Sequence, residues 1–501
     1  MTSDLNSTPR IAIIGAGPAG LTAGYLLAKN GNFVVNVFEK DPVYVGGISR
    51  TETYKGFHFD IGGHRFFSKS KEVEDFWTEI LGDELLERPR SSRIYYNNVF
   101  FNYPLKAGEA LQKLGVIESG LCMLSYLKAK LFPVKKPANF EEWVTNQFGK
   151  RLFRIFFKTY TEKVWGIDCR EISADWAAQR IKGLSLSAAI KNAFAAPGKQ
   201  GSSQIKTLID SFRYPKYGPG QMWNTCKMKA LEMGAKVYMG EGVVKLTQLK
   251  NLQWELETGS GAVFSNYDYV ISSAPLKHLV KAISNYVSPA LKQAASSLAY
   301  RDFITVVLIL KDNHSFDDNW IYIHDPSVKM GRIQHFKSWS PYMVPDESMV
   351  CYGLEYFCFE GDQLWKSTDE QLTDLGKSEL EKVGLAKASD ILDSYVVRQP
   401  KAYPVYDQGY QEHVAVIRNE LKQYEGLIMI GRNGMHKYNN QDHSMMTAML
   451  AVKNIISGKP LFDLWNVNQD AEYHEGGDRG AEEGGRKIPA RIIPGASVVN
   501  S

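Results

Sequence analysis

Cysteine is scarce in this sequence, with five residues among 501 and no pair spaced as C-x-x-C. Such scattered cysteines are typical of free thiols in a reducing compartment, and they indicate neither a disulfide framework nor a zinc site. The net charge is also small, +4 from 59 basic and 55 acidic residues. Bulk charge therefore gives no support for nucleic-acid binding.

Long hydrophobic runs are absent too. No apolar stretch approaches the roughly 20 residues that span a bilayer, and residues 1–9 are polar, without the apolar core of a signal peptide. We therefore expect a cytoplasmic protein. The sequence lacks H-E-x-x-H, G-x-S-x-G and a P-loop lysine motif, so metallohydrolase, serine hydrolase and NTPase activities have no support. No metal site is expected, and the length predicts more than one domain.

A glycine-rich turn near the N-terminus organises the chain. An apolar run over Ile11–Ile14 predicts a buried parallel strand, and residues 21–29 predict a helix. Between them lie the glycines of a G-x-G-x-x-G pattern, Gly15, Gly17 and Gly20. Glycines allow the tight turn and a close approach of the backbone to a pyrophosphate, which the helix N-terminus attracts. Glu39 ends a second predicted strand about 20 residues later, where an acid accepts the ribose hydroxyls of an adenosine.

Two further glycine pairs indicate which dinucleotide binds. Gly46-Gly47 precede Arg50, and Gly62-Gly63 precede His64. So much backbone near one ligand is more than NAD requires, and it favours FAD, whose ring and ribityl chain must also be buried. A plain strand-end turn is the alternative for Gly62-Gly63. The run from Glu39 to Arg50 resembles the flavoprotein superfamily of amine oxidases, protoporphyrinogen oxidases and UDP-galactopyranose mutases.

The order of predicted elements and this resemblance imply an α/β fold, with a Rossmann-type FAD-binding domain, an inserted helical domain and an antiparallel β-sheet substrate domain. Residues 300–310 and 349–359 predict strands of that sheet, and residues 92–102 predict a hairpin turning at Asn97-Asn98. The expected division is FAD-binding parts at 1–105, 206–290 and 401–463, a helical insertion at 106–205, the sheet at 291–400 and a disordered tail at 464–501.

A second group of motifs resembles the bacterial UDP-galactopyranose mutases, beginning with Y-T-x-K-x-W-G at residues 160–166. The resemblance implies substrate-binding roles for Phe156, Tyr160, Thr161, Trp165, Arg180 and Arg301. It implies catalytic roles for His64, Arg180, Arg301, Tyr356 and Tyr438. It also places the backbone of Val244 at the adenine, and Arg432 and Asp442 near the flavin. These residue types fit the chemistry, because guanidinium groups bind phosphate oxygens and aromatic faces bind pyrimidines.

Each of these assignments has a structural alternative. Trp165 could be a core residue, Arg180 a solvated helix residue, Arg301 a strand-end charge and His64 a hydrogen-bonded structural histidine. The match is collinear over most of residues 11–456, with departures at residues 65–67, at 439–441 and in a longer segment at 105–139.

Three functions remain open from the sequence. The first is an FAD-dependent mutase that interconverts the pyranose and furanose forms of a UDP-sugar through an adduct between the sugar and N5 of the reduced flavin. The second is an FAD-dependent oxidoreductase acting on an amine, a porphyrinogen or a polyprenoid. The third is a non-catalytic flavin-binding subunit. The expected partner is a small molecule, and the sequence allows a homo-oligomer.

One predicted helical region has two possible interpretations. Residues 107–130 predict a helical region, in which the apolar run 121–132 is followed by Lys135-Lys136. An amphipathic helix of a cap domain is the simpler interpretation. Docking on a membrane surface is the alternative, and it would suit a lipid-linked substrate.

Overall fold

The computed structural model describes residues 8–105, 107–174, 176, 211–313 and 316–468. Its first layer is a parallel sheet in the order β19-β13-β1-β2-β9. The strands are β1 (Arg10–Ile14), β2 (Val34–Glu39), β9 (Lys236–Met239), β13 (Tyr269–Ser272) and β19 (Leu427–Met429). Ile11–Ile14 are buried, as expected for a parallel sheet covered on both faces.

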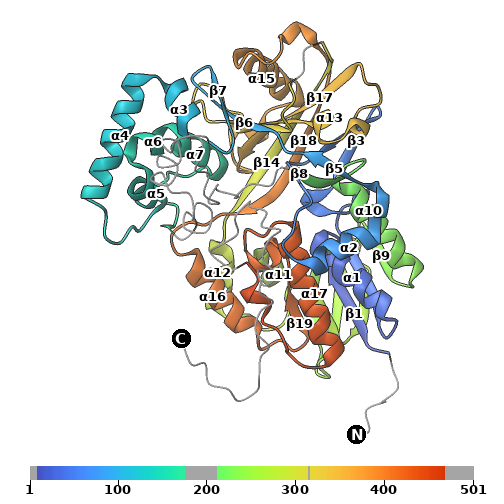
Figure 1. Cartoon of the computed structure of the whole chain (residues 1–501). Helices are drawn as coiled ribbons and strands as arrows, with labels where there is room; N and C mark the ends of the chain where they lie inside the picture. The colour runs from blue at the N-terminus through green and yellow to red at the C-terminus, as the bar shows by residue number, and fades with distance from the viewer. Residues whose placement is uncertain (1–7, 106, 175, 177–210, 314–315, 469–501) are drawn as a thin grey trace.

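Helices and a small sheet provide that cover. Helix α1 (Pro18–Asn30) packs against α10 (Pro219–Glu232) and α17 (Gln441–Ser457). An antiparallel sheet of β10 (Val243–Gln248), β11 (Trp254–Thr258) and β12 (Val263–Tyr267) joins the same hydrophobic core. Figure 1 shows this nucleotide-binding layer in the lower right of the molecule. The nucleotide layer is thus assembled from three separate stretches of chain.

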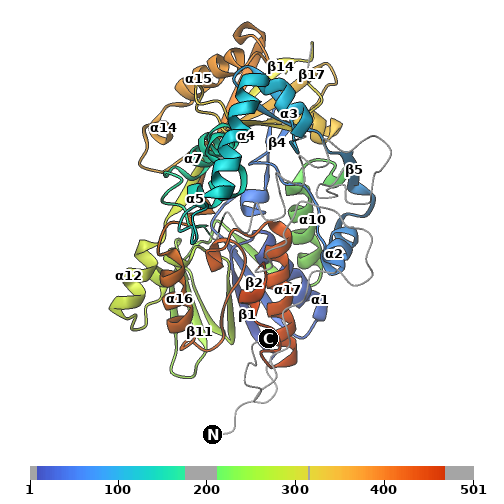
Figure 2. The same cartoon turned by 60° about the vertical axis from the view of Figure 1, so that its left-hand side comes forward.

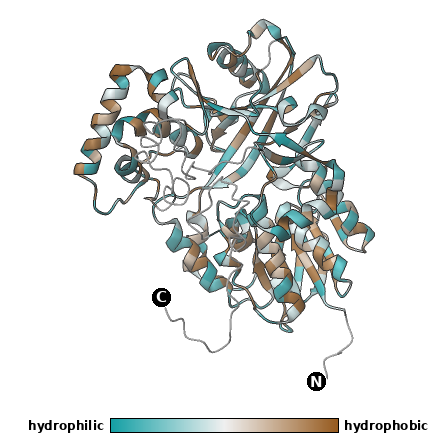
Figure 3. Ribbon diagram, in the orientation of Figure 1, coloured by the Kyte–Doolittle hydropathy of each residue, from teal (hydrophilic) through white to brown (hydrophobic). Residues whose placement is uncertain are grey.

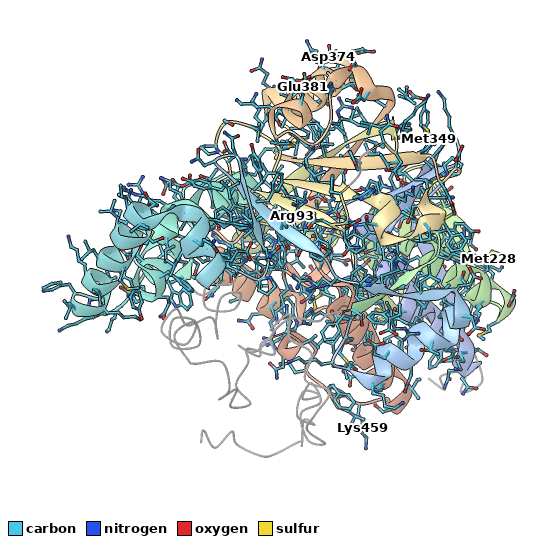
Figure 4. All side chains as sticks on the ribbon, turned by 45° about the horizontal axis from the view of Figure 1, so that its top comes forward. Arg93, Met228, Met349, Asp374, Glu381 and Lys459 are labelled. Atoms are coloured by element: carbon cyan, nitrogen blue, oxygen red, sulfur yellow. The ribbon has the colours of Figure 1, made fainter. Side chains whose placement is uncertain are left out.

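The second layer is a seven-stranded sheet in the order β18-β14-β17-β16-β15-β6-β7. Its strands are β6 (Ser92–Tyr96), β7 (Val99–Asn102), β14 (Tyr300–Lys311), β15 (Trp320–Ile323), β16 (Arg332–His335), β17 (Met349–Cys358) and β18 (Ile391–Pro404). Helix α15 (Asp369–Lys382) covers one face with Leu372 and Leu380. Asp374 and Glu381 lie on its outer side (Figure 4). The other face of the sheet looks toward the nucleotide-binding layer.

A group of helices projects from this sheet, and Figure 2 brings it forward. It contains α3 (Ala107–Leu114), α4 (Val116–Leu131), α5 (Phe140–Phe148), α6 (Lys150–Phe153) and α7 (Thr159–Trp165). A π-helical turn, Arg154–Lys158, joins α6 to α7. Such turns are rare and frequently occur at functional sites.

Short elements connect the layers. They are β3 (Thr51–Tyr54), β4 (Phe57–Asp60), α2 (Lys71–Leu81), β5 (Leu85–Pro89), β8 (Ser211–Pro215), α11 (Leu276–Ala282), α12 (Pro289–Ser297), α13 (Phe336–Trp339), α14 (Gln363–Lys366) and α16 (Tyr410–Leu421). Strands β3 and β4 form one hairpin, and β5 pairs with β8. Among the described residues, no helix is long and apolar enough to cross a membrane.

The α/β fold class is confirmed, but one local prediction is corrected. The hairpin β6–β7 turns at Asn97-Asn98, both with positive φ, as expected. It belongs to the seven-stranded sheet, since β6 pairs with β15, and not to the first nucleotide-binding part. The last helix begins at Gln441 and is capped by Asn440. Residues 177–205 and the tail after residue 468 lie outside the described part.

Candidate functional site

The first glycine turn has the geometry that a dinucleotide requires. Gly15 has a φ of +97°, and a Cβ on Gly20 would lie 1.8 Å from the carbonyl oxygen of Gly15. Both positions are therefore restricted to glycine by the fold itself. Gly17, at the N-terminus of α1, differs because a Cβ there would meet no protein atom within 4 Å. The space in front of Gly17 is left open at the positive end of a helix.

The second glycine pair faces the same space. The amide of Gly46 donates to the carbonyl of Ala16 over 2.8 Å. A Cβ on Gly47 would lie 3.6 Å from the Cα of Gly17. Two glycine turns thus meet in front of α1, which fits a pyrophosphate held by backbone N–H groups.

Glu39 lies at the end of β2 beside this turn. Its carboxylate accepts hydrogen bonds from the amides of Ala16, at 2.7 Å, and Asp41, at 3.0 Å. A Cβ on Gly242 would lie 2.9 Å from Cβ of Lys40, so the start of β10 is adjacent to the residue after Glu39. Val244 belongs to β10 and so lies in the same region as Glu39. Its predicted contact with adenine stays a prediction.

The third glycine pair brings the nucleotide layer against the large sheet. A Cβ on Gly63 would lie 3.0 Å from Nε2 of Gln334, and one on Gly62 would lie 3.7 Å from Nη2 of Arg332. His64 donates from Nε2 to the carbonyl of Ile61 over 2.9 Å. Burial, with the nearby Arg432 and Arg332, lowers the pKa of His64 to about 4. The imidazole is therefore neutral at pH 7.

A polar row crosses the face of the sheet opposite this turn. Thr305, Glu355, Arg332 and Tyr322 are register partners on the adjacent strands β14, β17, β16 and β15. Glu355 is fully buried, accepts from Nε of Arg332, and accepts from Nε2 of Gln334 over 2.7 Å. A buried carboxylate requires such partners, because an unpaired buried charge is strongly destabilising.

Arg332 has unused binding capacity. Its Nε is bonded to Glu355, whereas its two terminal nitrogens have no hydrogen-bond partner among the described residues. Burial acts to lower the pKa of Arg332, but Glu355 and the surrounding tyrosines raise it well above the usual value. Nη2 lies near Gly62, as described above. The guanidinium therefore keeps its positive charge, and its two terminal nitrogens, here called the free fork, can donate to a ligand. A planar guanidinium of this kind is the group that binds carboxylate or phosphate best.

Aromatic rings lie near Arg332 and near a second arginine, Arg432. Tyr160 stacks on His324, with centroids 4.8 Å apart, and meets Tyr322 edge-on at 5.3 Å. Tyr403 stacks on Tyr438 at 5.5 Å. The guanidinium carbon of Arg432 lies 5.3 Å from the ring of Tyr403 and 5.4 Å from the ring of Tyr438. The site thus combines guanidinium groups with two groups of aromatic rings, the aromatic walls, which suits a ligand with anionic and planar parts.

Lys163, the lysine of the Y-T-x-K segment, has a structural role. Its Nζ donates to the carbonyls of Ile323, Asp325 and Met330 at 2.6–3.1 Å. Burial lowers its pKa to about 8. The lysine ties α7 to the sheet and so holds Tyr160 against His324.

Three predicted substrate residues are packed into the protein interior. Trp165 is 2% exposed, with its ring 5.1 Å from that of Trp176. Phe156 meets Phe101 edge-on at 5.3 Å in a separate core cluster, and Thr161 is also buried. The side chains of all three are buried, and their roles in substrate binding stay predictions.

Tyr356 and Arg301 both form hydrogen bonds with other parts of the protein. Tyr356 lies on the α15 side of the sheet, where its hydroxyl donates to Glu379 over 3.1 Å, so the structure does not bring this predicted catalytic residue to the polar row. Arg301 donates to the carbonyls of Val164, Lys163 and Phe357 and so anchors the end of α7. Its contact with a diphosphate stays a prediction. Arg180 lies outside the described residues.

Three predicted cofactor residues surround the glycine turns. Arg50 donates from Nε to Glu52 over 2.9 Å. Arg432 donates from Nε to the carbonyl of Asn439 over 2.7 Å. Asp442 is buried and accepts from the hydroxyl of Ser68 over 3.0 Å. Their contacts with a cofactor remain predictions.

Sequence reasoning missed the polar row and part of the aromatic walls: Tyr322, His324, Arg332, Gln334, Glu355 and Tyr403. A signal was available for three of them. Glu355 interrupts a strand that is otherwise apolar, and Arg332 and Gln334 alternate with Ile333 in a strand pattern. A charge in a buried strand indicates a paired or functional group.

Comparison with known proteins agrees with this architecture. Residues 13–80 match the model of the NAD(P)-binding Rossmann-like domain. Among curated proteins, a 4,4'-diapophytoene desaturase from Methylomonas sp is 46% identical over 56 residues, which is 11% of each chain. A thiamine thiazole synthase from Thermotoga maritima is 38% identical over 94 residues, 18% of this chain and 31% of that protein. These matches span a third or less of the relatives' length.

Solved structures match over much more of the chain. A reduced UDP-galactopyranose mutase has a TM-score of 0.77 at 23% identity, covering 90% of this chain and 94% of the mutase. A candidate protoporphyrinogen oxidase from Exiguobacterium sp. 255-15 has a TM-score of 0.68 at 17% identity, covering 90% of this chain and 100% of the oxidase. A putrescine oxidase has a TM-score of 0.61 at 15% identity, covering 90% of this chain and 99% of the oxidase. At these identities the likeness shows the fold alone.

Proposed function

We propose that this protein is an FAD-dependent enzyme whose substrate binds between the third glycine turn and the seven-stranded sheet. Support for the cofactor comes from the open space at Gly17, the adjoining turn at Gly46-Gly47 and the carboxylate of Glu39. These groups fit the pyrophosphate and ribose of a dinucleotide. Bound FAD would supply a ring able to exchange electrons with a substrate or, when reduced, to act as a nucleophile.

The free fork of Arg332 carries the proposal for the substrate. A half-buried guanidinium with tyrosines nearby favours an anionic ligand with a planar part, and a UDP-sugar has both in its diphosphate and its pyrimidine. We therefore propose a nucleotide-sugar mutase, which interconverts pyranose and furanose forms without net oxidation. The extent of the structural likeness to the mutase, over nearly the whole of both chains, agrees with this choice.

The roles of the chain's own residues follow from their geometry. Glu355 and Gln334 hold Arg332 in one orientation, so that its charge is ready when a phosphate leaves the sugar. His64 stays neutral and keeps its ring fixed by the bond to Ile61. Tyr160 lies near Arg332 and Tyr438 lies near Arg432, and each provides a ring face and a hydroxyl. Positioning and charge stabilisation are thus the protein's contribution.

Redox stoichiometry tests the mutase reaction. Protein reduced with dithionite under anaerobic conditions should convert many equivalents of UDP-galactose per flavin, as followed by NMR, with no further electron donor. The oxidised protein should be nearly inactive. Reduction of the oxidised flavin by a compound without a nucleotide, at one equivalent per flavin, would instead identify an oxidoreductase.

An oxidoreductase acting on a lipid-like substrate is the second candidate. The observation that favours it is the exposed apolar surface of α4, described below. The desaturase similarity at the N-terminus is compatible with it but covers only the dinucleotide turn.

A further inference from the structure

Helix α4 presents its apolar side to solvent. Six large apolar side chains make up this surface, the α4 face: Val116 (91% exposed), Ile117 (82%), Leu121 (39%), Leu124 (65%), Leu127 (49%) and Leu131 (73%). Phe132, 77% exposed, and Val134, 43% exposed, extend it beyond the helix. Figure 3 shows brown segments along α4 at the outer edge of the molecule. Contiguous apolar surface of this kind marks an interaction site.

The helix is amphipathic with the usual orientation reversed. At about 100° per residue, the six side chains occupy one arc of roughly 140°. The opposite side carries Cys122, Tyr126 and Ala129, which are buried against the rest of the helical group. Small or mixed residues therefore attach α4 to the protein, while its leucines point outward. Packing among the residues that the structure describes does not explain these leucines.

The charged residues beside the α4 face indicate what kind of partner binds it. Residues 119–136 contain Lys128, Lys130, Lys135 and Lys136 and no acidic residue. None of these four lysines forms an ion pair within the described ranges of the chain. The nearest acid on the helix, Glu118, is bonded to Arg151. The α4 face is thus bordered by unneutralised positive charge.

We propose that the α4 face docks the protein on an anionic membrane surface, with the apolar side chains among the acyl chains and the lysines at lipid headgroups. A helix of 16 residues is about 24 Å long and would lie in the plane of the interface. A second copy of the chain is a poorer occupant. In a symmetric dimer, Lys128, which projects within the apolar arc, would approach its own copy.

Vesicle flotation tests the proposal with the full-length, flavin-loaded protein. The protein should float with phosphatidylcholine vesicles containing about one third phosphatidylglycerol, and much less with phosphatidylcholine alone. Leu124→Glu/Leu127→Glu should reduce the bound fraction at least about tenfold. Replacing the four lysines with glutamine should reduce it by a similar factor, since each basic residue near an anionic surface contributes about 1 kcal/mol.

The matched control carries the same two charges on other exposed apolar positions. Met228→Glu/Tyr286→Glu alters residues that are 52% and 81% exposed, far along the chain from α4, and should float like the unmodified protein. Unchanged flavin absorbance and circular dichroism would show that each variant is folded. The proposal is overturned if the unmodified protein stays with the soluble fraction, or if the α4 double variant floats normally. It is also overturned if light scattering shows a dimer that this variant dissociates without any vesicle binding.

Discussion

Strand parity decides which side chains reach the site. On β17, Glu355 and Phe357 face the nucleotide-binding layer, whereas Leu354 and Tyr356 face α15. Because successive side chains alternate between faces, an alignment error of one residue exchanges a site residue for a core residue. Tyr356 is therefore a structural tyrosine and Glu355 the residue beside the proposed substrate.

Tyr356→Phe should leave ligand binding unchanged and lower stability. The substitution removes the hydroxyl that donates to buried Glu379, and losing one such partner costs about 1–3 kcal/mol. Urea unfolding measures the loss, and calorimetry with UDP measures binding. Tyr403→Phe, on the site face, is the comparison variant. Weaker UDP binding in Tyr356→Phe alone would contradict the placement.

Arg332→Lys should weaken UDP binding by about 1.5–3 kcal/mol, the range for hydrogen bonds to charged groups. Lysine keeps a positive charge beside Glu355 but loses the planar fork. Calorimetry with the reduced protein provides the measurement. Arg93→Lys is the matched control, because Arg93, on β6, is already paired with Asp318. Equal affinity in Arg332→Lys and the unmodified protein would remove Arg332 from the substrate site.

At the scale of the element, the turn before α1 separates glycines that serve the fold from one that serves the ligand. Gly20 is required because β1 and α1 approach too closely for any side chain. Gly17 has an ordinary φ of −77° and no protein atom near its missing side chain. Close approach of a ligand to this backbone would account for a glycine at this position.

Gly17→Ala should fold normally and lose FAD, whereas Gly20→Ala should be destabilised whether or not FAD is added. The reason is that the new methyl group meets open space in one case and the carbonyl of Gly15 in the other. Thermal unfolding of the apo-protein and flavin retention on gel filtration are the two readouts. A Gly17→Ala protein that remains fully yellow would argue against the proposed pyrophosphate position.

At the scale of the whole molecule, several histidines are buried in their neutral form. Burial is the main cause in each case, and it lowers the pKa of His324 to about 3 and the pKa values of His64, His335 and His436 to about 4. Their unfolded forms take up protons below about pH 6.5 while the folded forms do not, so stability falls with falling pH. Asp60 acts oppositely, since burial raises its pKa to about 7 and the folded state holds its proton.

Acidification should therefore destabilise the protein at pH values well above those at which ordinary carboxylates take up protons. Four histidines outweigh one aspartate, and the net loss between pH 7.5 and 5.5 should be about 3 kcal/mol. Urea unfolding at both pH values measures it. An unfolding midpoint that rises on acidification would show that these histidines are not buried as neutral groups.

Local sequence determined the nucleotide-binding part of this protein. The spacing of Gly15, Gly17 and Gly20 with Glu39 defines a strand, turn, helix and second strand within one short stretch, so short-range patterns sufficed. The strands at residues 300–310 and 349–359 were predictable for the same reason, because buried strands leave continuous apolar runs.

The substrate side was decided by tertiary structure. Arg332, Glu355 and Tyr322 become neighbours only through the pairing of three separate strands, and the side each presents depends on a register that no local pattern fixes. Trp165 shows the same limit, because its motif is compatible with a ligand face and only packing against Trp176 makes it a core residue. Sequence thus predicted the strand, turn and helix of the proposed dinucleotide site, and the assembled sheet determined which side chains lie opposite the third glycine turn.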